Sequence, residues 1–351
     1  MIRGQNMSGR WVSGEFAFVS EDKAKQLSGN LATPGDVVIT QRGTLGQVSI
    51  VPAEPYARYV LSQSQMKLAP DPTKADSLFL YYLFNDEEQQ DYIRRNATQS
   101  GVPHTNLGFL RSTPIRLPSV QDQRAIAGVL GALDDKIELN RRMNETLSAL
   151  ARTLYRRLKN EVASEASIYE YAQVAYGAPF ASAQFNSHRE GMPLIRIRDL
   201  ATFAPEVWTT QRLPRETVIE PGDLVVGMDG EFRAQIWLGD RALLNQRVCS
   251  FRPKNRVPLS FLWQAVRVDL AFYEQAKTGT TVIHLGKSDV DRFTTPAPSV
   301  EQLDAFSSQA EPLVAKLVAN AQESRTLAEL RDTLLPKLIS GELRVSDATI
   351  D

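Results

Sequence analysis

An internal repeat constrains the fold of this chain of 351 residues more than any other feature. Pro118-Ser119-Val120 recurs 180 residues later as Pro298-Ser299-Val300. The apolar positions that follow keep this offset, and the polar residue Asn140 falls on Asn320. A match of this kind at a fixed offset is typical of a duplicated structural unit. The chain therefore consists of two copies of one plan, each a globular domain followed by a long helix.

The match extends upstream with small gaps. Residues 34–38 (PGDVV) pair with residues 221–225 (PGDLV), and His104 pairs with His284. We expect recognition-type domains over residues 1–117 and 161–297, and long helices over residues 118–160 and 298–345. The second copy carries an additional stretch, roughly residues 167–194, and the first copy begins at the equivalent of Leu194. We therefore expect the first domain to lack its opening segment.

Residues 119–158 and 301–340 have the heptad pattern of a coiled coil. Apolar residues alternate in steps of four and three, and about 38 residues at ~1.5 Å each would make a rod of roughly 55–60 Å. A parallel or antiparallel pairing of the two helices is favoured over two independent helices, each packed on its own domain. Pro312 and Pro336 are expected to break or kink the second helix. The predicted seam comprises Ile126, Leu130, Leu133, Ile137, Asn140, Leu147, Leu150 and Leu154, with Leu313, Leu317, Asn320, Leu327 and Leu334.

Asn140 and Asn320 stand out as polar residues in an apolar seam. A lone asparagine at such a position lowers stability but fixes the register of a coiled coil, ideally by pairing with a second asparagine. The two asparagines therefore favour pairing of the two helices with each other.

The globular domains combine short strands with one main helix, which predicts an α+β fold. In the first copy we expect strands at residues 35–41, 47–52 and 59–68, a helix at 75–97, and a strand near 114–118. In the second copy we expect strands at 222–228, 234–239 and 247–253, and a helix near 258–277.

Catalytic and metal-binding signatures are weak. The chain contains no GxGxxG and no HExxH, and Gly286-Lys287-Ser288 lacks the glycine that a phosphate-binding loop needs five residues earlier. Three histidines and one cysteine do not suggest a metal cluster, and Cys249 lies in an apolar strand, where we expect it in the core. The single cysteine, the lack of an apolar run of about 18 residues and the polar N-terminus together indicate a cytoplasmic protein.

Polar loops recur at corresponding places in the two copies and differ in residue type. Gln and Asn can contact adenine with two hydrogen bonds and Arg can contact guanine in the same way, so these loops are candidates for reading DNA bases. The net charge of −1 argues against a simple basic DNA-binding protein. Ordinary solvated loops remain the alternative for any single residue, including His104 and His284. The candidate DNA contacts are Arg3, Gln5, Asn6, Gln41, Arg42, Thr44, Gln63, Gln65, His104, Thr105, Asn106, Arg196, Arg198, Arg233, Gln246, Arg247, Thr280, Thr281 and His284.

Three segments resemble a known family. Residues 122–158 (DQRAIAGVLGALDDKIELNRRMNETLSALARTLYRRL) are similar to the first central helix of specificity subunits of type I restriction-modification systems. Residues 33–52 (TPGDVVITQRGTLGQVSIVP) resemble the target-recognition domains of that family, and residues 330–343 (LRDTLLPKLISGEL) its usual C-terminus.

The resemblance implies a non-catalytic DNA-recognition subunit with two target-recognition domains, each reading half of a split, asymmetric site. It implies an antiparallel coiled coil that sets the spacing between the half-sites. The expected partners are double-stranded DNA, two methyltransferase subunits that use S-adenosylmethionine, and motor-nuclease subunits that use ATP and Mg²⁺, with no cofactor bound by this chain. The alternatives are a coiled-coil adaptor or a degenerate subunit with only one working recognition domain.

Overall fold

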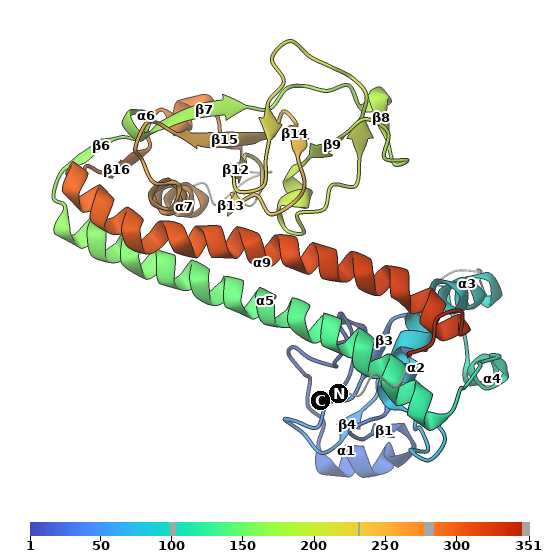
Figure 1. Cartoon of the computed structure of the whole chain (residues 1–351). Coiled ribbons are helices and arrows are strands. Elements are labelled where there is room, and N and C mark those ends of the chain that lie inside the picture. Colours follow the sequence, from blue (N-terminus) through green and yellow to red (C-terminus); the bar gives the residue numbers. More distant parts are fainter. Residues whose placement is uncertain (99–102, 231, 277–283, 346–351) are drawn as a thin grey trace. The chain divides into compact units, whose positions relative to one another are not determined.

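The computed structural model describes residues 1–98, 103–230, 232–276 and 284–345. The chain divides into two compact units (Figure 1). Unit 1 comprises Met1–Ile137 with Thr326–Asp351, and unit 2 comprises Glu138–Arg325. The long helices α5 (Val120–Glu161) and α9 (Val300–Ser340) each contribute one part to each unit.

Unit 1 is built on a small antiparallel sheet with the strand order β3-β2-β5. Its strands are β2 (Val37–Thr40), β3 (Val48–Ile50) and β5 (Gln65–Leu68), and a second pair joins β1 (Leu31–Ala32) to β4 (Tyr59–Val60). The helices are α1 (Glu21–Gln26), α2 (Ser77–Asn85), α3 (Glu87–Asn96) and α4 (Leu107–Ser112), with short 3₁₀ turns at η1 (Gly4–Asn6) and η2 (Ser28–Asn30). Helix α2 packs its Phe79, Leu80 and Leu83 with β2 and β3 and with the ends of both long helices.

Unit 2 contains two larger sheets. The first has the antiparallel order β13-β12-β15-β7, made of β7 (Ala172–Tyr176), β12 (Leu224–Gly227), β13 (Ala234–Ile236) and β15 (Val248–Pro253). The second has the order β11-β14-β9-β10-β8, made of β8 (Phe185–Asn186), β9 (Met192–Ile195), β10 (Trp208–Thr209), β11 (Val218–Ile219) and β14 (Ala242–Leu244). The remaining elements are β6 (Glu165–Ser167) paired with β16 (Thr294–Pro296), α6 (Ile168–Tyr171), α7 (Leu259–Ala276), α8 (Lys287–Val290), η3 (Ser182–Gln184) and η4 (Ile197–Leu200).

The same turn precedes the central strand of each unit. Gly35 and Gly222 have positive φ angles of 87° and 100°, which a residue without a Cβ adopts at little cost. The carboxylate of Asp36 accepts a hydrogen bond from the Thr33 amide at 2.9 Å, and Asp223 accepts one from Glu220 at the same distance. The repeat detected in the sequence is therefore a repeat of structure.

The two long helices pack against each other in an antiparallel sense within each unit. In unit 2 the Asn140 amide donates to the Asn320 carbonyl at 3.3 Å, and the Asn144 amide donates to the Leu317 carbonyl at 3.1 Å. Residue numbers thus rise along α5 while they fall along α9. In unit 1, Arg331 donates to Asp134 at 2.6 Å. Of the pairings considered, the antiparallel one is confirmed, and two independent helices are excluded.

The seam differs from the predicted one at Leu150. Asn140 and Asn320 are both buried, and each side chain contacts another asparagine: Asn140 donates to the Asn320 carbonyl, and the Asn320 amide donates to Asn144 Oδ1 at 2.9 Å. Leu150 is 46% exposed, and the fully buried Ala151 takes its place because the apolar stripe steps by four after Leu147. The expected seam position of Leu150 was therefore wrong.

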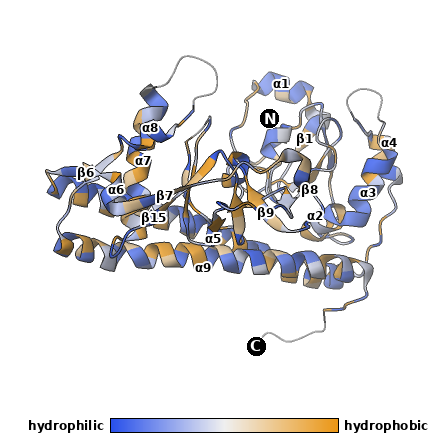
Figure 2. Ribbon diagram, turned by 90° about the horizontal axis from the view of Figure 1, so that it is seen from above, coloured by the Kyte–Doolittle hydropathy of each residue, from blue (hydrophilic) through white to orange (hydrophobic). Residues whose placement is uncertain are grey.

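Helix α9 runs without a break through both of its prolines, so the expected break was wrong. Pro312 and Pro336 are exposed and lie on the solvent face, where the chain can tolerate the missing N–H. Figure 2 shows that α9 alternates hydrophilic and hydrophobic residues along its length, as expected for a helix with one buried face.

Three further expectations required correction. The predicted helix 75–97 is two helices, because Asp86 ends α2 in extended conformation and caps α3 through a hydrogen bond from Glu88. The predicted strand 59–68 is divided into β4 and β5 by a turn at residues 62–64. Residues 114–118 form no strand. Their counterpart β16 pairs with β6, and the described part of unit 1 has no strand corresponding to β6.

Cys249 occupies the core position predicted for it. The side chain is fully buried in β15, and this burial raises the pKa of its thiol to about 12.

Candidate DNA-recognition surfaces

In unit 1, three chain segments meet at the end of β2. The Gln41 amide donates to the Ser64 carbonyl at 2.8 Å, and the Thr105 amide donates to the Gln41 carbonyl at 2.8 Å. Arg42 and His104 form an isolated antiparallel bridge. We call this junction of residues 41–44, 62–65 and 103–106 corner 1. It brings together eight of the candidate DNA contacts.

In unit 2, the corresponding segments meet in the same way. The Met228 amide donates to the Arg247 carbonyl at 3.0 Å, and the Leu285 amide donates to the Met228 carbonyl at 2.7 Å. Asp229 and His284 form the bridge that Arg42 and His104 form in unit 1. This junction, residues 227–229, 245–247 and 284–285, is called corner 2. The predicted equivalence of His104 and His284 is confirmed.

The backbone of the two corners is shared, whereas the side chains have different charges. Asp229 stands where corner 1 has Arg42, and Arg247 stands where corner 1 has Ser64. In corner 2 the Asp229 carboxylate pairs with Arg247 Nε at 3.3 Å and also contacts the His284 ring. Corner 2 is therefore an ion-paired cluster, and corner 1 presents an arginine whose side chain is exposed.

The candidate residues of unit 1 differ in how far their side chains are exposed to solvent. Gln5, Arg42, Thr44, Gln63 and Asn106 are exposed, and Arg3, Gln41 and His104 are half-buried. Asn6, Gln65 and Thr105 are buried. The Asn6 amide donates at 2.9 Å to the carbonyls of both Ser13 and Glu15, so this side chain holds the local turn. Burial of these three side chains favours a structural role for them.

The candidate residues of unit 2 lie in corner 2 and around η4. Gln246, Arg247 and His284 are exposed in corner 2. Arg198 is exposed at η4, but Arg196 is half-buried and paired with Asp199 and with Glu206 at 2.7 Å. Arg233 is half-buried after β12. Thr280 and Thr281 lie outside the described residues.

The chain is similar in sequence to several known proteins. A family model described as the type I restriction modification DNA specificity domain matches residues 6–149. The chain is 31% identical to the EcoBI type I restriction enzyme specificity subunit of Escherichia coli, over 52% of this chain and 39% of that protein. It is 24% identical to the MjaIX specificity subunit of Methanocaldococcus jannaschii, over 94% of this chain and 82% of that protein. The chain is therefore similar to type I specificity subunits, in one case over most of its length.

A solved structure shows the same fold. The crystal structure of a type I restriction-modification S subunit from M. genitalium superimposes with a TM-score of 0.54 at 16% identity, covering 88% of this chain and 83% of that one. This chain combines two repeated regions of strands and helices with two long helices. The alignment spans less than half of the E. coli relative.

Sequence reasoning missed Asp229 as a candidate site residue of corner 2. Arg233 was a candidate DNA contact from the same loop, but an aspartate does not match the Gln, Asn and Arg side chains on which the candidates were chosen. The available signal was its place in the repeat, where it corresponds to Arg42.

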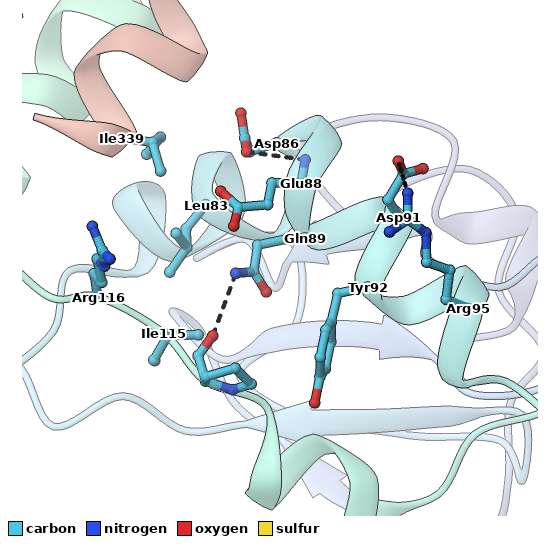
Figure 3. Close-up of a pocket in the computed structure, with 11 residues that line it drawn as sticks. Leu83, Asp86, Glu88, Gln89, Asp91, Tyr92, Arg95, Ile115, Arg116 and Ile339 are labelled. Atoms are coloured by element: carbon cyan, nitrogen blue, oxygen red, sulfur yellow. Dashed lines mark hydrogen bonds and ion pairs between the residues drawn. The ribbon is translucent and has the colours of Figure 1, made fainter. Parts of the chain in front are cut away.

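A cavity of about 530 Å³ lies elsewhere in unit 1, between α3, residues 114–116 and Ile339 (Figure 3). Gln89 Nε2 donates to the Pro114 carbonyl at 3.3 Å along its wall. Its lining mixes carboxylates with Arg95 and Arg116 and includes none of the candidate DNA contacts. Over the described residues there is neither a group of three metal-binding side chains nor a helix long and apolar enough to cross a membrane.

Proposed function

We propose that this chain reads a bipartite, asymmetric DNA site, with one half-site per recognition domain. In this role it directs adenine methylation and restriction by partner subunits. The observation that carries the proposal is the pair of corners, in which one hydrogen-bonded backbone framework holds different side chains. Loops that vary on a shared scaffold suit the recognition of two different sequences.

The exposed side chains of the corners match the chemistry of base edges. In corner 1, Arg42 could donate two hydrogen bonds to guanine, and Gln63 could contact adenine. In corner 2, Arg247 stands in the position of Ser64 and could also contact guanine, and its ion pair with Asp229 limits the orientations available to it. The two corners are therefore proposed to prefer different bases.

We infer the location, partners and lack of catalysis from the similarity to specificity subunits. We propose that the chain works in the cytoplasm, carries no catalytic site and binds no cofactor itself. Two methyltransferase subunits would supply S-adenosylmethionine chemistry, and motor-nuclease subunits would supply ATP- and Mg²⁺-dependent cleavage. The recognition domains are proposed to cover residues 1–117 and 161–297, and the paired helices would set the spacer between the half-sites.

A second candidate is a subunit with only one working recognition domain. It is favoured by the smaller sheet of unit 1, where three strands stand in place of the four-stranded β13-β12-β15-β7 sheet of unit 2.

The salt dependence of DNA affinity tests the proposal against a purely structural adaptor. Phosphate contacts release counterions, so we expect the affinity of the full chain for duplex DNA to fall by at least about tenfold between 50 and 200 mM salt. Fluorescence anisotropy with a labelled duplex would measure this. An affinity for DNA that is absent, or does not change with salt, would favour the adaptor.

A further inference from the structure

The carboxylate of Asp229 joins the other two charged or polar side chains of corner 2. Its Oδ2 pairs with Arg247 Nε at 3.3 Å, and its Oδ1 contacts Nδ1 of the His284 ring. Arg247 Nη1 also lies 3.2 Å from His284 Nδ1. The backbone bridge between Asp229 and His284 and the hydrogen bond from the Met228 amide to the Arg247 carbonyl fix the segments that carry these side chains.

These contacts leave the outer end of the Arg247 guanidinium available. A guanidinium has N–H donors on Nε and on both terminal nitrogens. Asp229 engages Nε and His284 lies beside Nη1, whereas Nη2 has no hydrogen-bond partner among the residues that the structure describes. Two parallel bonds to O6 and N7 of guanine need only the outward N–H groups of the terminal nitrogens. The ion pair therefore limits the motion of the side chain without using the donors that would read a base.

A carboxylate on a surface that meets DNA needs a physical reason. Its negative charge repels the phosphates of any duplex, so it lowers the sequence-independent part of the affinity. An arginine held in one orientation by that carboxylate loses less side-chain freedom on binding than a mobile one. The pair of Asp229 with Arg247 is therefore suited to discriminate between bases and is poorly suited to bind DNA of every sequence.

Corner 1 carries its arginine at the other position of this pair. Arg42 corresponds to Asp229 by the backbone bridges, and Ser64 corresponds to Arg247 by the amide bonds that end β2 and β12. Neither of these two positions in corner 1 holds a carboxylate. The two corners therefore present an arginine from different chain segments of the same backbone framework.

A glutamine is common to both corners. The strand registers make Gln65 and Val248 equivalent, so Gln63 and Gln246, which lie two residues earlier in each segment, are equivalent as well. Both glutamines are exposed. The corners thus share one side chain of the kind that reads adenine and differ in the adjacent pair.

We propose that Asp229 is a positioning residue that orients Arg247 toward one guanine in the half-site read by unit 2, and that positions 42 and 64 hold the corresponding determinant in unit 1. The proposal rests on the proposed function, since it assigns a base to a surface that is proposed to read DNA. The arrangement of each pair then decides where its guanine lies relative to the base read by the shared glutamine.

Selection of bound duplexes from a randomised pool by the full chain tests the role of Asp229. Arg247→Ala identifies the position of the site that depends on this arginine. We expect Asp229→Asn to lower the preference for guanine at that position by about threefold to tenfold, because a released arginine must be ordered on binding. The affinity for a duplex of unrelated sequence should rise and depend more steeply on salt, because a negative charge is removed. A residue needed only for folding would instead lower both affinities.

Two further variants separate positioning from direct contact. In an Arg247→Ala chain, Asp229→Asn should cause no further loss of preference at the same position, because the side chain that it orients is absent. The matched control is Gln246→Ala, which alters an exposed side chain next to Arg247. It should change the preference at a different position, and Asp229→Asn should leave that position unchanged.

An exchange variant, Arg42→Asp with Ser64→Arg, tests the correspondence in unit 1. We expect it to prefer a guanine at a new position in its half-site. The spacing of this guanine from the base read by Gln63 should equal the spacing between the bases read by Arg247 and Gln246 in the native chain. Because the exchange is made in unit 1, its result does not depend on the stability of unit 2.

The proposal is overturned if Asp229→Asn keeps the native preference, if its loss adds to that of Arg247→Ala, or if specific and unrelated duplexes lose affinity equally. An exchange variant that selects the native half-site would overturn the correspondence of the two pairs. A native chain that selects no motif would contradict the proposed function, and the role of Asp229 would fall with it. A native motif combined with any of the other outcomes contradicts the role of Asp229 or the correspondence alone.

Discussion

At the scale of single residues, Arg42 and Arg247 distinguish the two corners. Arg42→Ala should relax base preference in one half-site only, and Arg247→Ala in the other only, because each arginine belongs to a different recognition domain. A lost two-bond contact to guanine costs about 1–3 kcal/mol of discrimination. Competition binding with duplexes substituted in one half-site would measure the effect. Loss of discrimination in the same half-site by both variants would contradict the assignment of one corner to each half.

Asp269 on α7 makes the stability of unit 2 depend on pH. Burial raises the pKa of its carboxyl to about 7; Glu165 adds to this rise, and the Thr294 amide and Lys159 oppose it. A carboxyl with a raised folded-state pKa favours folding when protonated, and this contribution is lost as pH rises through about 7. We expect the melting temperature to fall more between pH 5 and 8 for the native chain than for Asp269→Asn. Parallel curves for the two proteins would show that Asp269 is not the responsible group.

At the scale of elements, two leucines of α5 in unit 2 form a matched pair because one is buried and the other is exposed. Leu158 is 5% exposed and Leu150 is 46% exposed. Leu158→Ala should destabilise unit 2 by about 2–5 kcal/mol, because it removes a buried side chain and leaves a cavity. Leu150→Ala should cost less than about 1 kcal/mol. Urea denaturation would compare the free energies of unfolding of the two variants. Equal losses of stability would show that Leu150 contributes to the seam.

The long helices and central strands were predictable because their signals are local. The heptad spacing predicted the bounds of α5 and α9 to within a few residues. The Pro-Gly-Asp turns predicted where β2 and β12 begin. The division of α2 from α3 depends on Asp86, whose capping hydrogen bond competes with a continuous helix that the apolar pattern alone favours. Residues 114–118 have the composition of a strand, but a strand requires a partner, and single-sequence patterns do not reveal its absence.

The candidate site was predictable to a similar degree. The repeat placed His104 and His284 at equivalent positions, which the two bridges confirm. Composition could not separate exposed Gln63 from buried Gln65, because both lie in the same polar stretch and only the sheet decides which side chain points inward. Asp229 was missed because its contribution depends on contacts with Arg247 and His284 from distant segments.

At the scale of the whole molecule, the chain uses one structural plan twice, with different side chains at the two corners. The two copies are unequal, since unit 2 has the strand β7 that the described part of unit 1 lacks. If each recognition domain reads its own half-site, as proposed, the DNA site is asymmetric.

The most direct test of the proposed function is to co-express the chain with the methyltransferase subunit proposed as its partner and to map methylated adenines across the host genome. We predict a single split motif with two different defined halves and a constant spacer. A motif with only one defined half would contradict reading by both domains and favour one working domain. A stable complex that methylates no specific site would contradict the recognition role itself.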